Sequence, residues 1–186
     1  MKTLRNVLLA LLLTIVAMGL LLPNDFVVQR QIQIAATPAQ IHPLVDDLNQ
    51  WPQWSPWLQQ DPSVIITVGQ PSAGVGANQR WQDNSGGGHL VITASSPETG
   101  VQYNAFFDGA EHANPASITF TEQDNGSTKV HWHMRGAFSM PIIGPYMAIA
   151  ADSMIGPTFE QGLSRLKLVA EPQPSPEPAL ESTGQL

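Results

Sequence analysis

The chain has 186 residues, of which 42% are hydrophobic and 12% charged, with 15 glycines and 16 prolines. This length suits one domain with appendages, and the many turn residues favour a β-rich fold over a helical bundle. The formal net charge of −7 argues against a nucleic-acid partner, because such a surface repels phosphates. The chain has no cysteine, which excludes disulfides, thiolate metal sites and a cysteine nucleophile.

Residues 1–23 predict a membrane anchor or an export signal. Lys2 and Arg5 precede an apolar run from Val7 to Leu22 without a charge, close to the length that spans a bilayer. The run ends without a small-residue cleavage site, which favours retention, and the basic residues place the N-terminus in the cytoplasm. We therefore expect a single-pass protein, in the inner membrane if the source is bacterial, whose domain is extracytoplasmic. The alternative is a secreted or periplasmic protein after signal cleavage.

Hydrophobic periodicity predicts the first elements after this segment. Residues 26–34 alternate as a strand, and Thr37-Pro38 begins a short helix that Pro43 can split. Turns rich in Gly, Pro, Asn and Ser then separate further strands. These strands are expected near residues 63–69, 76–82, 88–95, 100–107, 115–122 and 127–138.

The C-terminal part changes to a helical period. From Gly144 to Glu171 the apolar residues follow one stripe, and Pro157 within it predicts a kink or a fresh helix start. Residues 171–186 are rich in Pro and Glu and predict a disordered tail. Runs of strands followed by one long helix indicate an α+β fold, in which a seven-stranded antiparallel sheet wraps around that helix.

A series of short motifs supports this order. They are Thr37-Pro38-Ala39-Gln40-Ile41, then Trp54-Ser55-Pro56-Trp57 with Asp61-Pro62, then Gly74-Val75-Gly76-Ala77 before Trp81, then residues 126–132 and finally residues 154–163. In this order they resemble the helix-grip superfamily, also called SRPBCC or START-like, in its polyketide cyclase/dehydrase and lipid-transport branch. The resemblance covers residues 26–170 and implies a domain at 24–170. It also implies a deep apolar cavity between sheet and helix that holds lipids, sterols, polyketides or other hydrophobic ligands.

Strand alternation gives candidates for lining such a cavity. In the last strand Val130, Trp132 and Met134 share the inward parity, whereas His131 and His133 point outward. For each candidate, the alternative is a side chain that only fills the core. The candidate ligand-binding residues are Trp54, Trp57, Trp81, Tyr103, Phe107, Phe120, Trp132, Met134, Met147, Met154 and Phe159.

The segment WPQWSPW places Trp51, Trp54 and Trp57 three residues apart. This spacing is the period of 3₁₀ and polyproline II helices, so the three rings can lie along one side despite the prolines. We expect them to close one end of the cavity or to fill it, with at least one buried indole whose N–H is hydrogen-bonded. An exposed platform for sugars or a bilayer is the alternative.

Candidate chemistry is sparse. His131-x-His133 has the spacing of a ligand pair but lies beside two cations without a third ligand, so no metal is expected. No phosphate loop and no cofactor motif is present. Tyr103 is a weak catalytic candidate as a general acid or base. We therefore expect a membrane-tethered domain that binds or carries a hydrophobic small molecule or lipid, with a polyketide cyclase/dehydratase-like pocket enzyme or a closed-core interaction domain as alternatives.

Overall fold

The computed structural model describes residues 2–57, 61–84, 86–108 and 112–172. The predicted disordered tail therefore lies outside the described residues from 173 onward. The elements in chain order are α1 (Lys2–Leu21), β1 (Asp25–Ile34), α2 (Pro38–Asp46), α3 (Trp51–Trp54), β2 (Ile65–Val68), β3 (Asn78–Gln82), β4 (Gly87–Ser96), β5 (Gly100–Phe107), β6 (Asn114–Glu122), β7 (Thr128–Ala137) and α5 (Gly144–Ala170).

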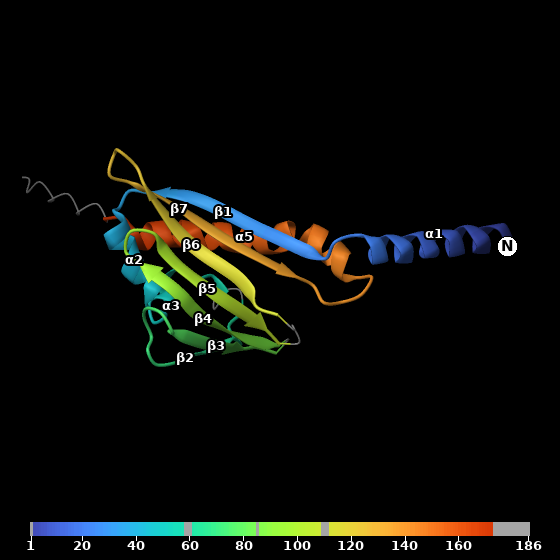
Figure 1. Ribbon diagram of the computed structural model, residues 1–186, viewed down its shortest axis with the longest axis horizontal. Coiled ribbons are helices and arrows are strands. Elements are labelled where there is room, and N and C mark those ends of the chain that lie inside the picture. The colour runs from blue at the N-terminus through green and yellow to red at the C-terminus, as the bar shows by residue number, and fades with distance from the viewer. Residues whose placement is uncertain (1, 58–60, 85, 109–111, 173–186) are drawn as a thin grey trace, which may run out of the picture.

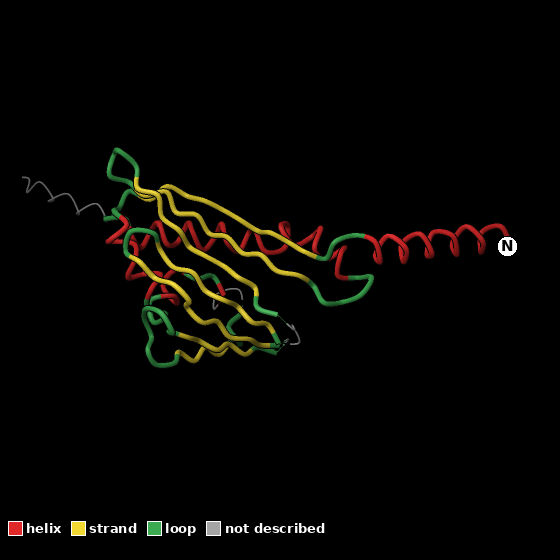
Figure 2. Tube along the Cα trace, in the orientation of Figure 1, coloured by secondary structure: helices red, strands yellow, loops and turns green. Residues whose placement is uncertain are grey.

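The strands form one seven-stranded antiparallel sheet in the order β1-β7-β6-β5-β4-β3-β2. The first strand pairs with the last, and the hairpins from β2 to β7 follow in sequence. The curved sheet wraps around α5, while α2 and α3 lie at one end of that helix (Figures 1 and 2). The predicted α+β helix-grip fold is confirmed.

Alternation along the strands separates a core face from an outer face. In β7, Val130, Trp132 and Met134 are buried while the residues between them are partly or fully exposed, as the sequence predicts. Within the described part of the chain, the buried hydrophobic side chains run from Phe26 to Leu166, and α1 contributes none of them. The core therefore belongs to the sheet, α2, α3 and α5.

Helix α5 continues through Pro157 as one element, so the prediction that a new helix begins at this proline is wrong. Pro157 leaves the carbonyl of Ser153 without its helical donor, but both residues are exposed, so solvent can satisfy that oxygen. Helix α2 likewise contains Pro43 without a break.

Helix α1 extends away from the domain (Figure 1). It is 20 residues long, apolar enough to cross a membrane, and almost entirely exposed. Its C-terminal half meets the start of α5, where the Tyr146 hydroxyl donates to the Ile15 carbonyl at 2.7 Å. Gly19 packs so closely on Ile142 that an added Cβ would lie 2.4 Å from its carbonyl oxygen. These contacts join α1 to the domain at the beginning of α5.

Candidate functional site

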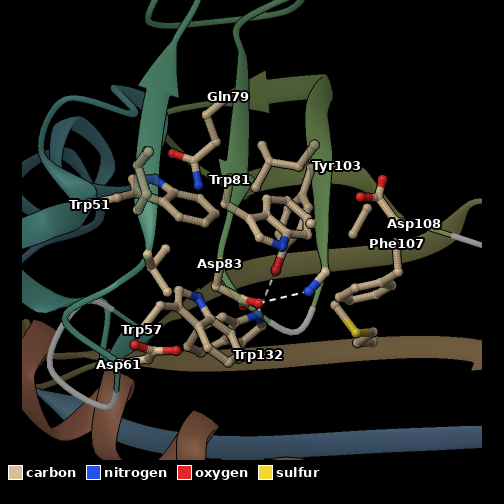
Figure 3. Close-up of a pocket in the computed structure, with 17 residues that line it drawn as sticks. Trp51, Trp57, Asp61, Gln79, Trp81, Asp83, Tyr103, Phe107, Asp108 and Trp132 are labelled. Carbon is tan, nitrogen blue, oxygen red and sulfur yellow. Dashed lines mark hydrogen bonds between the residues drawn. The ribbon is translucent and has the colours of Figure 1, made fainter.

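A cavity of about 470 Å³ lies between the inner face of the sheet and the segment that carries α3 and its following loop. Most of its surface is aromatic or aliphatic, and Figure 3 shows the side chains that converge on it. The lining residues are Trp51, Trp57, Asp61, Val64, Ile66, Gln79, Trp81, Asp83, Gly86, Gly87, Leu90, Tyr103, Ala105, Phe107, Asp108, Trp132 and Met134.

The deep wall of the cavity is a fixed aromatic cluster. Tyr103 and Trp132 are buried, and the Trp132 Nε1–H donates to the Tyr103 hydroxyl oxygen at 2.8 Å. On its other side Trp132 stacks on Phe159 of α5, with ring centroids 4.1 Å apart and planes 7° from parallel. Burial raises the pKa of Tyr103 above its usual range, so this hydroxyl stays protonated at neutral pH.

The three tryptophans of WPQWSPW differ in burial and in their relation to the cavity. Trp51 and Trp54 belong to α3 and are buried, and their indole N–H groups donate to the carbonyls of Val45 at 2.9 Å and Leu44 at 2.7 Å. The expected buried, hydrogen-bonded indole is therefore confirmed. Trp57 is 36% exposed and lines the cavity together with Trp51. Trp54 instead fills the core, in edge-to-face contact with Trp132.

One buried polar atom of the cavity lining has no hydrogen-bond partner among the described residues. Gln79 of β3 is 4% exposed and lines the cavity, and its Oε1 accepts no hydrogen bond from the described part of the protein. Figure 3 shows its amide pointing toward the rings of Trp51 and Trp81. Since buried acceptors are nearly always satisfied, this oxygen is available to a group that enters the cavity.

Three aspartates lie along the edge of the cavity, and we call them the acidic rim: Asp61, Asp83 and Asp108. Asp61 lies beside Trp57, Asp108 lies on the side of Phe107, and Asp83 lies between them (Figure 3). Turn geometry holds two of them, because Asp61 Oδ1 accepts from the Ser63 N–H and Asp83 Oδ1 from the Gly86 N–H, each at 2.8 Å. No Lys, Arg or His of the described chain lines the cavity.

The structure brings together part of the predicted site. Trp57, Trp81, Tyr103, Phe107, Trp132 and Met134 line the cavity, whereas Trp54, Phe120 and Phe159 are buried elsewhere in the core. Phe107 borders the cavity as predicted, although it is 43% exposed at the end of β5.

The prediction that Met147 and Met154 of α5 line the cavity is wrong. Met154 is 60% exposed and Met147 is partly exposed, and neither borders the cavity. At about 100° per residue, both lie roughly 100° or more from the centre of the stripe that α5 buries. They therefore fall on the flank of the helix instead of facing the sheet.

The cavity is also lined by residues that were not predicted from the sequence as ligand-binding residues. Trp51 belongs to the tryptophan segment expected at the cavity end, and Asp61 to one of the short motifs, but neither was predicted as a ligand-binding residue. Asp83 and Asp108 directly follow β3 and β5 and belong to no motif. Aspartate is a common residue in turns and loops, so the convergence of these three on one cavity has no local signal in the sequence.

The outward histidines of β7 form no part of this site. The His131 and His133 rings lie side by side on the other face of the sheet, with centroids 6.1 Å apart. Partial burial lowers the pKa of His131, and the nearby His133 and Lys129 lower it further. No group of three metal-ligand side chains gathers in the part of the chain that the structure describes.

Comparison with known proteins gives one family and several similar folds. A family model described as polyketide cyclase / dehydrase and lipid transport matches residues 25–171. No curated protein matches the sequence.

Among solved structures, protein CV1439 from Chromobacterium violaceum is 15% identical with a TM-score of 0.59, over 80% of this chain and 99% of that chain. Protein Ms6760 from Mycobacterium smegmatis is 16% identical with a TM-score of 0.56, over 81% and 93%. The solution structure of the Aha1 dimer from Colwellia psychrerythraea is 15% identical with a TM-score of 0.54, over 78% and 96%. At these identities the likeness shows the shared fold alone.

Proposed function

The chain belongs to the polyketide cyclase / dehydrase and lipid transport family, and from this premise we propose that its domain binds or carries a hydrophobic small molecule or lipid while tethered to a membrane. The observation that carries the proposal is the cavity of about 470 Å³ in the helix-grip domain. Its walls are largely aromatic, and each ligand methylene buried there contributes about 0.8 kcal/mol. A ligand chain or ring system can therefore bind through burial alone.

Binding fits the site better than catalysis. The protonated, deeply buried Tyr103 is a poor general base, and its oxygen already accepts from Trp132. The alternative of a cyclase- or dehydratase-like enzyme would use this hydroxyl as a hydrogen-bond donor to a substrate carbonyl. In that case Tyr103→Phe should abolish turnover and spare substrate binding.

Membrane tethering is supported by α1 and its surroundings. The helix has the length and hydropathy of a span, with Lys2 and Arg5 at its N-terminal end. Residues 136–151 carry no charge and include exposed Met140, Ile143 and Ile149. They lie where α1 meets α5, at the level where the outer surface of a bilayer would be if α1 spans it.

Part of the cavity lining lies at this end of the domain. Strands β3 and β5 end there, and β4 and β6 begin there, at the side of the domain from which α1 extends (Figure 1). The exposed lining residue Phe107 ends β5, and the exposed lining residue Asp108 follows it. A ligand could therefore pass between the membrane and the cavity over a short path.

The test is identification of small molecules that co-purify with the full chain. We expect a hydrophobic compound at near-stoichiometric amount, detected by native mass spectrometry and identified after extraction. Ala105→Leu narrows the cavity from its wall and should deplete this compound. Thr121→Leu makes a similar change on the exposed outer face of β6 and should not. Equal amounts in both variants, or none in the wild type, would contradict the proposal.

Topology has a separate test. In intact spheroplasts, a tag at the C-terminus should be open to added protease if the domain is extracytoplasmic. Protection of the tag would contradict the proposed orientation and leave the cavity proposal untouched.

A further inference from the structure

We propose that the cavity selects a hydrophobic amine, a ligand with an apolar body and a cationic nitrogen, and discriminates against carboxylated or phosphorylated lipids. This inference rests on the proposed ligand-binding function and adds the charge of the ligand to it. Three features of the cavity carry it: its charge, one orphan acceptor and its aromatic faces.

The charge of the lining is uniformly negative. Asp61, Asp83 and Asp108 form the acidic rim, and no basic side chain of the described residues lines the cavity. The chain as a whole carries a formal charge of −7, so no distant excess of cations offsets the rim. A carboxylate or phosphate that enters meets repulsion from each aspartate, whereas a cation meets attraction.

The orphan acceptor points to the same chemistry. Gln79 Oε1 is buried, borders the cavity and accepts nothing from the described protein. It needs a donor, and an ammonium group supplies up to three N–H donors and no acceptor. An ionised carboxylate supplies no donor and would leave this oxygen unsatisfied.

Aromatic faces complete the site. Trp51, Trp57 and Trp81 surround the cavity between Gln79 and the acidic rim (Figure 3). A cation within about 6 Å of an indole face is attracted by the ring quadrupole, most strongly for tryptophan. Rings and carboxylates in one cavity therefore favour a cation at its polar end and apolar groups elsewhere.

Coulomb's law gives the size of the expected preference for an amine over an alcohol or a carboxylate. A unit charge about 7 Å from one carboxylate in water-like surroundings changes an affinity roughly threefold. Three carboxylates act in the same direction, and salt screens each of them in part. We expect an amine to bind at least about threefold tighter than the matched alcohol, and at least about tenfold tighter than the matched carboxylate.

The experiment uses the full chain in phosphatidylcholine vesicles and three probes that share one chain: 11-bromoundecylamine, 11-bromoundecanol and 11-bromoundecanoate. Bromine quenches tryptophan on contact. All five tryptophans lie in the domain, where Trp51, Trp57, Trp81 and Trp132 line the cavity and Trp54 touches two of them. Partitioning of each probe into protein-free vesicles is measured separately, so each dissociation constant refers to free probe.

Charge reversal at the rim provides the decisive comparison. Asp108 is exposed, and Asp108→Lys should weaken the amine about five- to tenfold and strengthen the carboxylate by a similar factor. Asp124→Lys changes the net charge equally in the exposed β6–β7 turn, far from the cavity lining, and should leave the order unchanged. Gln79→Leu removes the acceptor and should reduce the preference of the amine over the alcohol.

The outcomes separate the two proposals. If the carboxylate or the alcohol binds as tightly as the amine, the charge inference is overturned while a hydrophobic cavity stands. If none of the probes quenches beyond partitioning, the ligand-binding function itself fails and the inference fails with it. An equal response of Asp108→Lys and Asp124→Lys would assign any preference to net charge and overturn the role of the rim.

Discussion

Gly162 of α5 lies against the six-membered ring of Trp132, and Gly162→Ala tests whether that ring can move. A Cβ at position 162 would lie 2.7 Å from Trp132 Cζ3 and 3.3 Å from Pro56 Cδ. Ordinary carbon contacts are about 3.5 Å or longer, so the new methyl overlaps the ring by about 0.8 Å. The ring is held by its stack on Phe159, its edge contact with Trp54 and its hydrogen bond to Tyr103.

Two effects of opposite sign determine how much Gly162→Ala changes the free energy of unfolding. Alanine stabilises a helix interior by up to about 1 kcal/mol relative to glycine. Overpacking a well-filled core costs about 1–3 kcal/mol, and the upper end applies because three contacts fix the ring. We expect a net loss of about 2 kcal/mol, which lowers the melting temperature by about 4–8 °C for a domain of this size.

Gly156→Ala is the matched control in the same helix. There the added Cβ would meet the guanidinium of Arg30, the far end of a flexible side chain that pairs with Asp152 and Glu160 at the surface. Arg30 can move away, so this variant should stay within about 0.5 kcal/mol of the wild type. The assay is thermal unfolding of the full chain in mild detergent, followed by near-UV circular dichroism. Equal melting temperatures for both variants would refute the view that Trp132 is immobile.

Other predictions concern the cavity and pH. Tyr103→Phe leaves the buried Trp132 N–H without its acceptor and should cost about 1–3 kcal/mol in urea unfolding, and an unchanged midpoint would mean that this hydrogen bond is dispensable. Trp57→Ala should weaken ligand binding with little effect on urea unfolding, because Trp57 is partly exposed. The pKa of His131 is lowered in the folded protein, so the unfolded chain binds more protons as pH falls below about 6.5, and folding loses stability there. As the pH is lowered from about 7 to about 5, the free energy of unfolding of His131→Gln should therefore rise relative to that of the wild type. A difference that does not change with pH would refute the lowered pKa.

Most of the fold could be predicted from the sequence because local and global signals agree. Alternation in 128–137, turn residues between the strands and a helical stripe after Gly144 each predict the element that forms. Helix α3 is the exception, since the Trp51–Trp54 spacing was interpreted as 3₁₀ or polyproline II. Proline at the second position of that short helix is tolerated because its missing N–H would have had no helical partner.

The cavity was less predictable, for a physical reason. Alternation identifies which side chains face the interior, but a cavity is space that those side chains leave unfilled. Trp54 and Trp57 belong to one motif, yet only Trp57 borders the cavity. The acidic rim combines turns more than 20 residues apart, and only the register of β3, β4 and β5 brings Asp83 and Asp108 to one end of the sheet.

Helix α5 influences the cavity although none of its described residues borders it. Trp132 contacts Phe159 on the helix side and donates to Tyr103 in the deep wall. A shift of α5 that moves Phe159 would therefore move the Trp132 ring, lengthen its hydrogen bond and change the position of the Tyr103 hydroxyl. Because the same helix begins at the contact between Tyr146 and α1, a change at the end of the domain where α1 joins it has a continuous packed route to the cavity.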